Sequence, residues 1–362
     1  MQPDSTAELE KALAKRILIL DGAMGTTIRG YGLTEEEARG TQFAKNEKDL
    51  LNNGDILSLT KPDVIGDIHR RFYEAGSDIV ETNTFSATTI SQSEFFVEDP
   101  RESGAGRKDP AFFEKKVLND SFLKQLTTDL NVEGAQLARK EADRIANETG
   151  RARYVAGAIG PMTVSLTNSP DAEDPGFRVV NFDQVKKAYA EQIEALIDGG
   201  VDILMVETIF DSLNAKAALV ACQEVFDTRG QRLPIIISAA VGRGGETMIS
   251  AQKAEALWTA VAHVKPLAIG LNCSLGPDLM KPFLEDLSAC STTHLSCYPN
   301  AGLPNPLAPT GFDLEPHHMA DYMKEFADAN LLNLAGGCCG NTPEHISAIA
   351  SILEKCAPRS AS

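Results

Sequence analysis

The stretch Ala-Gly-Ser-Asp-Ile-Val-Glu-Thr at residues 75–82 has a close counterpart in Gly-Gly-Val-Asp-Ile-Leu-Met-Val-Glu-Thr at 199–208. In both, a helical pattern stops at glycine, and a short β-branched run follows that ends in Glu-Thr. The helical pattern is clear at 181–198, where apolar residues recur at spacings of three and four. A unit of helix, glycine and strand that occurs twice is typical of a parallel sheet built from repeated modules.

Eight short apolar or β-branched runs, separated by amphipathic stretches, are the predicted strands: residues 17–20, 79–81, 154–158, 203–207, 235–239, 267–271, 294–297 and 331–335. Eight such units fit a closed barrel. No Gly-x-Gly-x-x-Gly follows the first run, so the sequence does not favour a dinucleotide-binding sheet. The predicted fold class is α/β, a single (β/α)8 TIM barrel over residues 17–357 with its site at the carboxyl ends of the strands.

Four segments lie outside the repeat. Residues 1–16 are predicted to be a helical lead-in, and residues 30–62 an extended excursion after the first strand. The charged stretch at 97–118, which carries Gly and Pro, is predicted to be a mobile surface insertion. Residues 358–362 are predicted to be a tail or the start of a linker.

Composition limits the function classes. A formal net charge of −17 argues against nucleic acid or an anionic membrane as partner, because both are bound by clustered Lys and Arg. No apolar run approaches the length of a membrane span, and residues 1–16 are too charged for a secretory signal. Seven cysteines without such a signal predict a reducing, cytoplasmic setting, in which clustered cysteines bind metal or do chemistry.

Polar and metal-type residues follow the predicted strands at their carboxyl ends, where barrels of this kind have their active sites. They are Asp21, Glu81, Thr82, Asn83, Glu207, Asn272, Cys273, Asn300, Cys338 and Cys339. The first and eighth strands are neighbours where the barrel closes, and the sixth lies two strands from the eighth. The ends of strands six and eight can therefore share one metal ion.

Three cysteines in two small-residue loops supply thiolates to one point: Cys273 in Gly-Leu-Asn-Cys, and Cys338 with Cys339 in Gly-Gly-Cys-Cys-Gly. Closed structural zinc sites use four protein ligands, whereas catalytic sites keep one position open. Consecutive side chains diverge along an extended chain, and the flanking glycines allow backbone conformations that relieve this. The pattern predicts a catalytic Zn²⁺. The alternative is a vicinal disulfide or two buried thiols.

Six motifs carry a resemblance to a known family: Asp-Gly-Ala-Met-Gly-Thr (21–26), Glu-Thr-Asn-Thr-Phe (81–85), Glu-Thr-Ile-Phe-Asp (207–211), Gly-Leu-Asn-Cys (270–273), Pro-Asn-Ala-Gly-Leu-Pro-Asn (299–305) and Gly-Gly-Cys-Cys-Gly (336–340). Over residues 17–357 the chain resembles the homocysteine S-methyltransferase family. Asn-Ala-Lys-Ala-Ala at 214–218 and the string at 299–305 resemble the homocysteine-binding module of cobalamin-dependent methionine synthases. The resemblance implies a (β/α)8 barrel, one zinc held by Cys273, Cys338 and Cys339, and homocysteine as methyl acceptor.

The hypothesis for the reaction is that the homocysteine sulfur fills the open position on zinc as a thiolate, the nucleophilic form of a thiol. Glu207 and Asp21 are the candidate partners of the substrate ammonium. Thr82, Asn83 and nearby backbone amides are the candidate donors to its carboxylate. The alternative for Glu207 is an acid that caps a helix or pairs with a lysine, and the alternative for Asp21 is an ordinary turn residue.

Two asparagines complete the predicted site. Asn272 is counted among the substrate-binding residues because it follows the sixth predicted strand at the barrel mouth. Asn300 is a candidate for the open zinc position in the absence of substrate, as the family resemblance implies. The alternative for Asn300 is a residue that stabilises the turn after Pro299.

Nothing in the chain resembles a site for the methyl donor. The cobalamin-binding motif Asp-x-His-x-x-Gly has its nearest counterpart in Asp-Ile-His-Arg-Arg-Phe at 67–72, which lacks the glycine. Methylcobalamin, recharged from methyltetrahydrofolate, is therefore expected on another module, with cobalamin-binding and folate-binding modules of the same enzyme as partners. The alternatives are a free-standing methyltransferase that uses betaine or S-methylmethionine, a non-catalytic zinc module that binds thiols, and a redox role for Cys338 and Cys339.

Overall fold

The computed structural model describes residues 4–102, 104, 106–308 and 310–360. Its strands are β1 (Leu18–Ile19), β2 (Ile79–Glu81), β3 (Tyr154–Ile159), β4 (Ile203–Ile209), β5 (Ile235–Ala239), β6 (Ala268–Asn272), β7 (His294–Tyr298) and β8 (Leu334–Ala335). They form one parallel sheet in the order β1-β8-β7-β6-β5-β4-β3-β2. All eight predicted strands are present, and the (β/α)8 barrel is confirmed.

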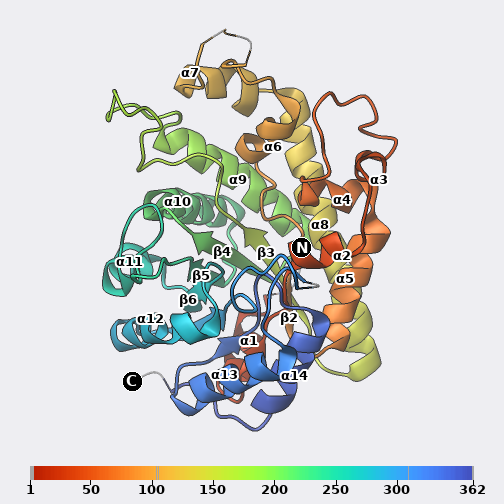
Figure 1. Ribbon diagram of the computed structural model, residues 1–362, viewed down its shortest axis with the longest axis vertical. Coiled ribbons are helices and arrows are strands. Elements are labelled where there is room, and N and C mark those ends of the chain that lie inside the picture. The colour runs from red at the N-terminus through yellow and green to blue at the C-terminus, as the bar shows by residue number, and fades with distance from the viewer. Residues whose placement is uncertain (1–3, 103, 105, 309, 361–362) are drawn as a thin grey trace.

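Helices alternate with the strands along the chain and surround the sheet (Figure 1). They are α1 (Thr6–Leu13), α2 (Met24–Gly30), α3 (Glu35–Arg39), α4 (Leu57–Thr60), α5 (Pro62–Glu74), α6 (Thr89–Phe96), α7 (Pro110–Phe113), α8 (Ser121–Thr149), α9 (Phe182–Gly199), α10 (Ser212–Arg229), α11 (Ala254–Val261), α12 (Pro277–Cys290), α13 (Pro316–Asp328) and α14 (Pro343–Leu353). Single turns of other helix types lie at Gly54–Ile56, Glu114–Leu118 and Ala262–Val264. None of the helices in the described ranges is long and apolar enough to span a membrane.

The repeated unit ends its helices at glycine for a conformational reason. Helix α9 begins at Asn181, whose side chain accepts from the Gln184 backbone N–H in a capping box. It ends at Gly200, which has φ of 93°, a left-handed conformation that glycine adopts at little cost. At the other copy of the unit, Gly76 has φ of 116°. The sequence signals for the helix stops are confirmed.

The barrel closes between β1 and β2 through carboxylates rather than through a full strand ladder. The Asp78 backbone N–H donates to the Ile19 carbonyl at 2.7 Å, and the Ile19 N–H donates to the Asp78 carboxylate at 3.0 Å. At the carboxyl end of the same seam, the Glu81 N–H donates to Asp21 Oδ2 at 3.0 Å. Asp78 is fully buried, and it is neutralised by Arg16 and Arg151, each at 2.6 Å. Two aspartates thus supply the acceptors that a missing ladder would have supplied.

The lead-in helix closes the amino-terminal end of the barrel. Leu9 and Leu13 of α1 are buried in one cluster with Leu18, Tyr154 and Ile236 of the barrel strands. Burying a leucine side chain of this kind stabilises a fold by roughly 2 kcal/mol. The helix predicted within residues 1–16 is therefore present at Thr6–Leu13 and is part of the barrel core.

The excursion at 30–62 has a small core of its own. It contains α3 and α4, and its buried side chains form a separate cluster with residues of α5, of α8 and of the loop after β2: Ala38, Phe43, Leu50, Ile56, Leu57, Ile65, Ala87, Leu126 and Leu130. In Figure 1, α4 lies beside α8 at the edge of the barrel, and α3 lies next to α4. The structure thus has a long excursion after β1, as predicted, and the excursion has a packed hydrophobic core of its own.

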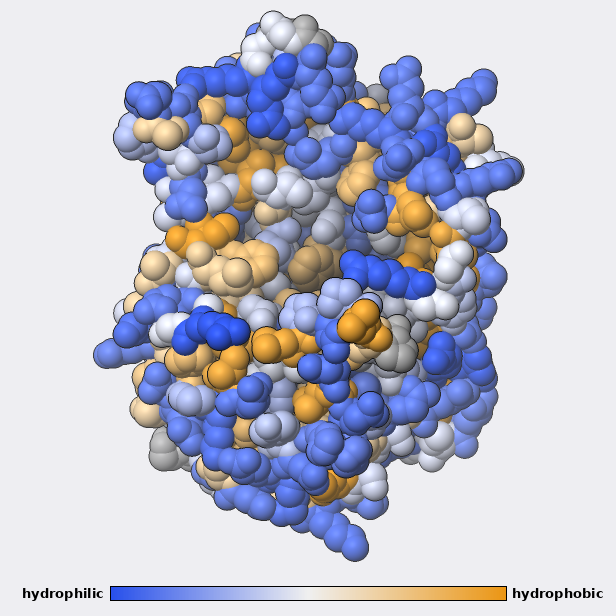
Figure 2. All heavy atoms as spheres, viewed as in Figure 1, coloured by the Kyte–Doolittle hydropathy of each residue, from blue (hydrophilic) through white to orange (hydrophobic). Residues whose placement is uncertain are grey.

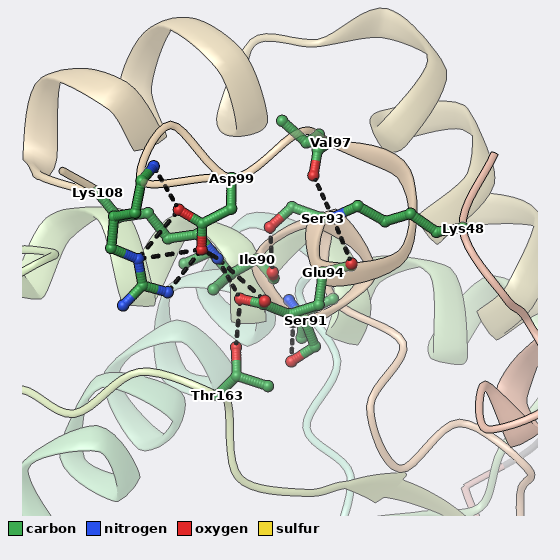
Figure 3. Close-up of polar contacts among 11 residues, drawn as sticks. Lys48, Ile90, Ser91, Ser93, Glu94, Val97, Asp99, Lys108 and Thr163 are labelled. Carbon is green, nitrogen blue, oxygen red and sulfur yellow. Dashed lines mark hydrogen bonds and ion pairs between the residues drawn. The ribbon is translucent and has the colours of Figure 1, made fainter. Parts of the chain in front are cut away.

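The prediction of a mobile surface insertion at 97–118 is wrong for its second half. Phe113, Val117 and Leu118 are fully buried and belong to the main core. The polar first half, residues 97–108, is joined to α6 by ion pairs, because Lys108 binds the carboxylate of Glu94 at 2.9 Å and that of Asp99 at 3.5 Å (Figure 3). Residues 103 and 105 lie outside the described residues. The charged composition that suggested mobility instead forms an ion-pair network.

The carboxyl-terminal residues that the structure describes, 358–360, pack against the barrel. Arg359 is buried, and its guanidinium donates to the Ser288 hydroxyl at 3.1 Å and to the Thr293 carbonyl at 3.0 Å. Its backbone N–H donates to the Leu332 carbonyl at 2.8 Å. Residues 358–360 therefore dock on the barrel, and residues 361–362 lie outside the described residues.

Candidate metal centre and active site

Three thiols meet at the carboxyl ends of β6 and β8. The Sγ atoms of Cys273, Cys338 and Cys339 all lie within 4.8 Å of one another, and those of Cys273 and Cys339 are 3.9 Å apart. Two sulfurs that each lie about 2.3 Å from a tetrahedral zinc are about 3.8 Å apart. All seven cysteines of the chain are free thiols in this structure. The number, type and spacing of these donors fit a zinc ion.

Cys273 reaches the cluster through a left-handed turn. Cys273 and Ser274 have φ of 57° and 55°, a conformation that costs a non-glycine residue on the order of 1 kcal/mol. The Ser274 hydroxyl donates to the Val241 carbonyl at 2.7 Å, and the Leu275 N–H donates to the Cys273 carbonyl at 2.6 Å. These bonds hold the strained turn, which directs the chain sharply away from β6 as soon as the cysteine has been placed.

The glycines of the second cysteine loop act mainly by having no side chain. A Cβ on Gly336 would lie 2.6 Å from the Leu20 Cβ, and a Cβ on Gly337 would lie 2.1 Å from the Asn341 Cγ. Only Gly340 of the three has a left-handed φ, at 83°. The expectation that all three glycines supply unusual backbone conformations is therefore correct only for Gly340.

Asn341, which the sequence did not single out, organises this loop. Its Nδ2 donates to the Pro299 carbonyl at 2.9 Å and to the Cys338 carbonyl at 3.1 Å. The Cys338 N–H donates to the same Pro299 carbonyl at 2.8 Å. The ends of β7 and β8 are thereby joined, and both cysteines are fixed relative to the loop that carries Asn300. No local sequence pattern marks Asn341 for this role.

Three carboxyl groups gather beside the thiols: Asp21, Glu81 and Glu207. Burial raises the pKa of Glu81 to about 7. Burial and then the nearby Glu81 charge raise the pKa values of Asp21 and Glu207 well above their usual ranges. The Tyr298 hydroxyl donates to Glu207 Oε2 at 3.4 Å, while Glu207 Oε1 is buried without a hydrogen-bond partner in the described structure. Within the described ranges, no ion pair joins these three acids to a lysine or arginine, so the group is suited to a cationic ligand.

The sequence profile of the homocysteine S-methyltransferase family matches residues 18–353. The chain belongs to the homocysteine S-methyltransferase family. Methyl transfer to homocysteine is the reaction that this membership supports. The resemblance carried by the six sequence motifs is confirmed, and it extends over nearly the whole chain.

Among solved structures, the chain is similar to homocysteine methyltransferase MmuM from Escherichia coli in three forms. The metallated form is 21% identical with a TM-score of 0.67, covering 96% of this chain and 99% of that chain. The oxidized form is 20% identical with a TM-score of 0.66, covering 96% and 98%, and the apo form is 21% identical with a TM-score of 0.63, covering 96% and 99%. At this identity the likeness shows a shared fold.

Within the site of this family member, the predicted substrate residues fall into two groups. Asp21 and Glu207 lie in the carboxyl cluster, together with Glu81, for which the sequence suggested a place but no role. Thr82, by contrast, accepts from the Ala158 backbone N–H at 3.0 Å, and Asn83 donates to the Gly54 carbonyl at 2.9 Å. These bonds engage Thr82 Oγ1 and Asn83 Nδ2 within the protein, and a role of either residue as donor to the substrate carboxylate stays a prediction.

Asn272 is also engaged within the protein. It is fully buried, its Oδ1 accepts from the Ser238 hydroxyl at 2.8 Å, and its Nδ2 donates to the Thr208 hydroxyl at 2.8 Å. The same Nδ2 faces Cys338 Sγ at 3.9 Å. Asn272 therefore lies against a predicted metal ligand, and its role as a substrate contact stays a prediction.

Asn300 keeps a free acceptor near the cysteines. Its Oδ1 is buried without a hydrogen-bond partner in the described ranges, and its backbone N–H donates to the Leu275 carbonyl at 3.0 Å. The next residue, Ala301, donates its N–H to the Cys339 carbonyl at 2.8 Å. Asn300 thus lies between the two cysteine loops, and its role as a resting metal ligand stays a prediction.

The nearest counterpart of a cobalamin-binding motif has its histidine buried in the protein interior. His69 is on α5 and fully buried, and neither ring nitrogen has a partner among the described residues. Burial lowers the pKa of His69 to about 3, so the ring is neutral at physiological pH. A histidine in this position is unable to approach a corrin.

Proposed function

We propose that the chain transfers a methyl group to the thiol of homocysteine, giving methionine, at a zinc ion held by Cys273, Cys338 and Cys339. What supports this most strongly is the convergence of three free thiols within 4.8 Å beside a buried group of carboxyls. Zinc bound there would supply the Lewis acidity that keeps a substrate thiol deprotonated at neutral pH. The chain's own residues then bind and orient the amino acid.

The carboxyl group gives a reason why an amino acid thiol is selected. Asp21, Glu81 and Glu207 repel one another, and a substrate ammonium relieves that repulsion by donating to the free Glu207 Oε1. The Tyr298 hydroxyl holds the other oxygen of Glu207, so the carboxylate keeps one orientation. A thiol without an amino group gains none of this binding energy.

Methylcobalamin, carried on another module and recharged from methyltetrahydrofolate, is the proposed donor. Exposed apolar side chains follow the strands at the barrel mouth: Phe85, Met248, Leu303 and Leu307, the last of them 94% exposed. The face drawn in Figure 2 is hollowed near its centre, and apolar patches lie around the hollow. An apolar rim of this kind suits a protein partner that brings its cofactor to the mouth.

Small onium donors, betaine or S-methylmethionine, are the second candidate, because the family description names the acceptor and no donor. An assay with homocysteine and each of the three donors separates the two readings. A protein that binds zinc and homocysteine but turns over with none of them would instead be a non-catalytic thiol-binding module.

Zinc-edge X-ray absorption with and without homocysteine tests the core of the proposal. Addition of homocysteine should change mixed ligation by sulfur and oxygen or nitrogen into ligation by four sulfurs. Cys273→Ala should lose zinc and activity together, whereas Cys356→Ala, which changes a half-buried thiol elsewhere, should lose neither. An active Cys273→Ala variant without zinc would refute the assignment.

A further inference from the structure

Asp211 accepts more hydrogen bonds than its place in the fold requires. It is the N-cap residue of α10, and in that role its Oδ1 accepts from the Leu213 N–H at 2.9 Å. The same Oδ1 also accepts from the Thr167 hydroxyl at 2.6 Å. Its Oδ2 accepts from the Ser165 hydroxyl at 2.7 Å and from the Thr167 N–H at 3.0 Å. A helix cap needs one acceptor, so the three further bonds serve the loop after β3, to which Ser165 and Thr167 belong.

Asn214, which lies three residues further along α10, binds the same loop. Its Oδ1 accepts from the Leu166 N–H at 2.9 Å, and its Nδ2 donates to the Val164 carbonyl at 2.7 Å. Asp211 and Asn214 are each only 5% exposed, so these bonds are shielded from water. The two side chains form a loop anchor that joins residues 164–167 to the start of α10.

The anchored loop borders Glu207, the proposed partner of the substrate ammonium. A small cavity of about 30 Å³ separates them, and Met162 and Val164 of the loop line it together with Glu207 and Asp211. One water molecule needs roughly 10–15 Å³ of such space, so the cavity is too small for an amino acid. The loop is therefore packed closely against the strand end that carries Glu207.

The position of Glu207 depends on contacts outside the sheet. The pairing of β3 with β4 ends at Val206, and the pairing of β4 with β5 shifts register between Val206 and Ile209. Thr208, within this irregular stretch, has φ of 54°. A bulge re-aims a side chain and interrupts the regular ladder. The direction of Glu207 is thus set by what holds the chain on either side of the bulge, and the loop anchor holds it on the carboxyl-terminal side.

We propose that Asp211 and Asn214 are positioning residues: by anchoring the loop after β3, they fix the bulged end of β4 so that Glu207 meets the substrate ammonium. The inference rests on the proposed function. Loss of the anchor weakens the grip on the amino end of the substrate. Zinc binding is unaffected, because the three cysteines lie at the ends of β6 and β8.

Asp211→Asn separates the anchor from the helix cap. Asparagine caps helices as well as aspartate does, so the bond from Leu213 is kept, whereas an amide group replaces one of the oxygens that face Ser165 and Thr167. Homocysteine binding to the zinc-loaded protein, measured by titration calorimetry, should weaken about tenfold, the value of one misplaced charge-assisted hydrogen bond. Binding of deamino-homocysteine, which has no ammonium, should not change, and neither should the zinc content.

Thr167 tests the same contact from the side of the loop, and it keeps the test decisive if Asp211→Asn does not fold. Thr167→Val removes the hydroxyl that donates to Asp211 and should weaken homocysteine binding about fivefold. Thr167→Ser keeps a hydroxyl and should bind homocysteine as wild type does. Asp120→Asn is the matched control, because Asp120 caps α8 and its carboxylate accepts from the Leu123 N–H alone within the described ranges.

Three results would overturn the inference and leave the proposed function intact. They are wild-type homocysteine affinity in both Asp211→Asn and Thr167→Val, an equal loss of affinity for homocysteine and deamino-homocysteine, and the same loss in Asp120→Asn. A wild-type protein that loads zinc but does not bind homocysteine would refute the proposed function, and the inference with it.

Discussion

Replacement of Asn272 by alanine tests whether this buried side chain holds the predicted metal ligand Cys338 in position. Asn272 Oδ1 accepts from the Thr208 N–H at 3.1 Å and from the Ser238 hydroxyl at 2.8 Å, and its Nδ2 donates to the Thr208 hydroxyl at 2.8 Å. Thr208 has φ of 54°, which a β-branched residue adopts only when its surroundings hold it there. The same asparagine faces Cys338 Sγ at 3.9 Å. One side chain thus supports both the end of β4 and a metal ligand.

The size of the effect follows from these bonds. Asn272→Ala removes three buried hydrogen bonds at roughly 1 kcal/mol each, so the free energy of unfolding should fall by about 3 kcal/mol. With an unfolding entropy of about 2.1 cal/mol/K per residue, this corresponds to a melting temperature lower by about 4 °C. Loss of a group that orients a ligand should also lower zinc affinity about tenfold to a hundredfold.

Calorimetry and zinc competition against a chromogenic chelator measure the two effects separately. Asn272→Asp is the informative companion, because it keeps the acceptors for Thr208 and Ser238 but replaces the amide donor near Cys338 with a carboxylate. It should melt closer to wild type than Asn272→Ala and yet hold zinc no better. Wild-type zinc affinity in Asn272→Ala, despite its lower stability, would refute a role in supporting Cys338.

Three other changes give independent outcomes. Glu207→Gln should raise the KM for homocysteine about tenfold to a hundredfold with zinc retained, since it removes the charge that faces the ammonium; an unchanged KM would place the ammonium elsewhere. Burial raises the pKa of Asp55 to about 7, so the stability it contributes is present below its unfolded pKa near 4 and is lost as the pH rises toward 7. The free energy of unfolding of Asp55→Asn, measured in urea, should therefore rise relative to that of wild type between pH 4 and 7, by at most about 1.4 kcal/mol per unit of pKa shift. The same pH dependence of stability in both proteins would contradict this. Arg359→Ala should lower the melting temperature by about 3 °C, because it removes bonds to the Ser288 and Thr293 region; no change would mean that the docked terminus contributes nothing.

The fold could be predicted because its signals are local. Each barrel strand is a short apolar run, and each copy of the repeated unit places glycine where the chain needs a left-handed turn, as Gly76 and Gly200 show. The three cysteines were equally visible, because Cys273 and the Cys338–Cys339 pair lie in small-residue loops at strand ends. The strand order then brings those ends together without further information from the sequence.

What the sequence did not predict depends on contacts between distant segments. Thr82 and Asn272 follow strands in the same way as Asp21 and Glu207, yet their side chains are held by partners on other strands. The insertion at 97–118 has charged residues in its first half and buried apolar residues, such as Phe113, in its second half. Its overall composition is polar and therefore does not reveal the buried part. Arg359 docks through carbonyls of α12 and the turn before β7, which no local pattern identifies.

The charges at the barrel mouth imply that metal and substrate stabilise one another. Cys273 is among the groups that raise the pKa of Glu207, after burial and the effects of Glu81 and Asp21. A divalent cation bound by three thiolates would still leave a formal charge of −1, so the loaded metal site, like ionised Glu207, would attract an ammonium. By reciprocity of linkage, an amino acid bound through its ammonium must tighten the metal site by the same factor that the metal tightens amino acid binding. The buried acids, whose mutual repulsion a substrate ammonium would relieve, would then favour binding of the amino acid at the expense of the stability of the empty protein.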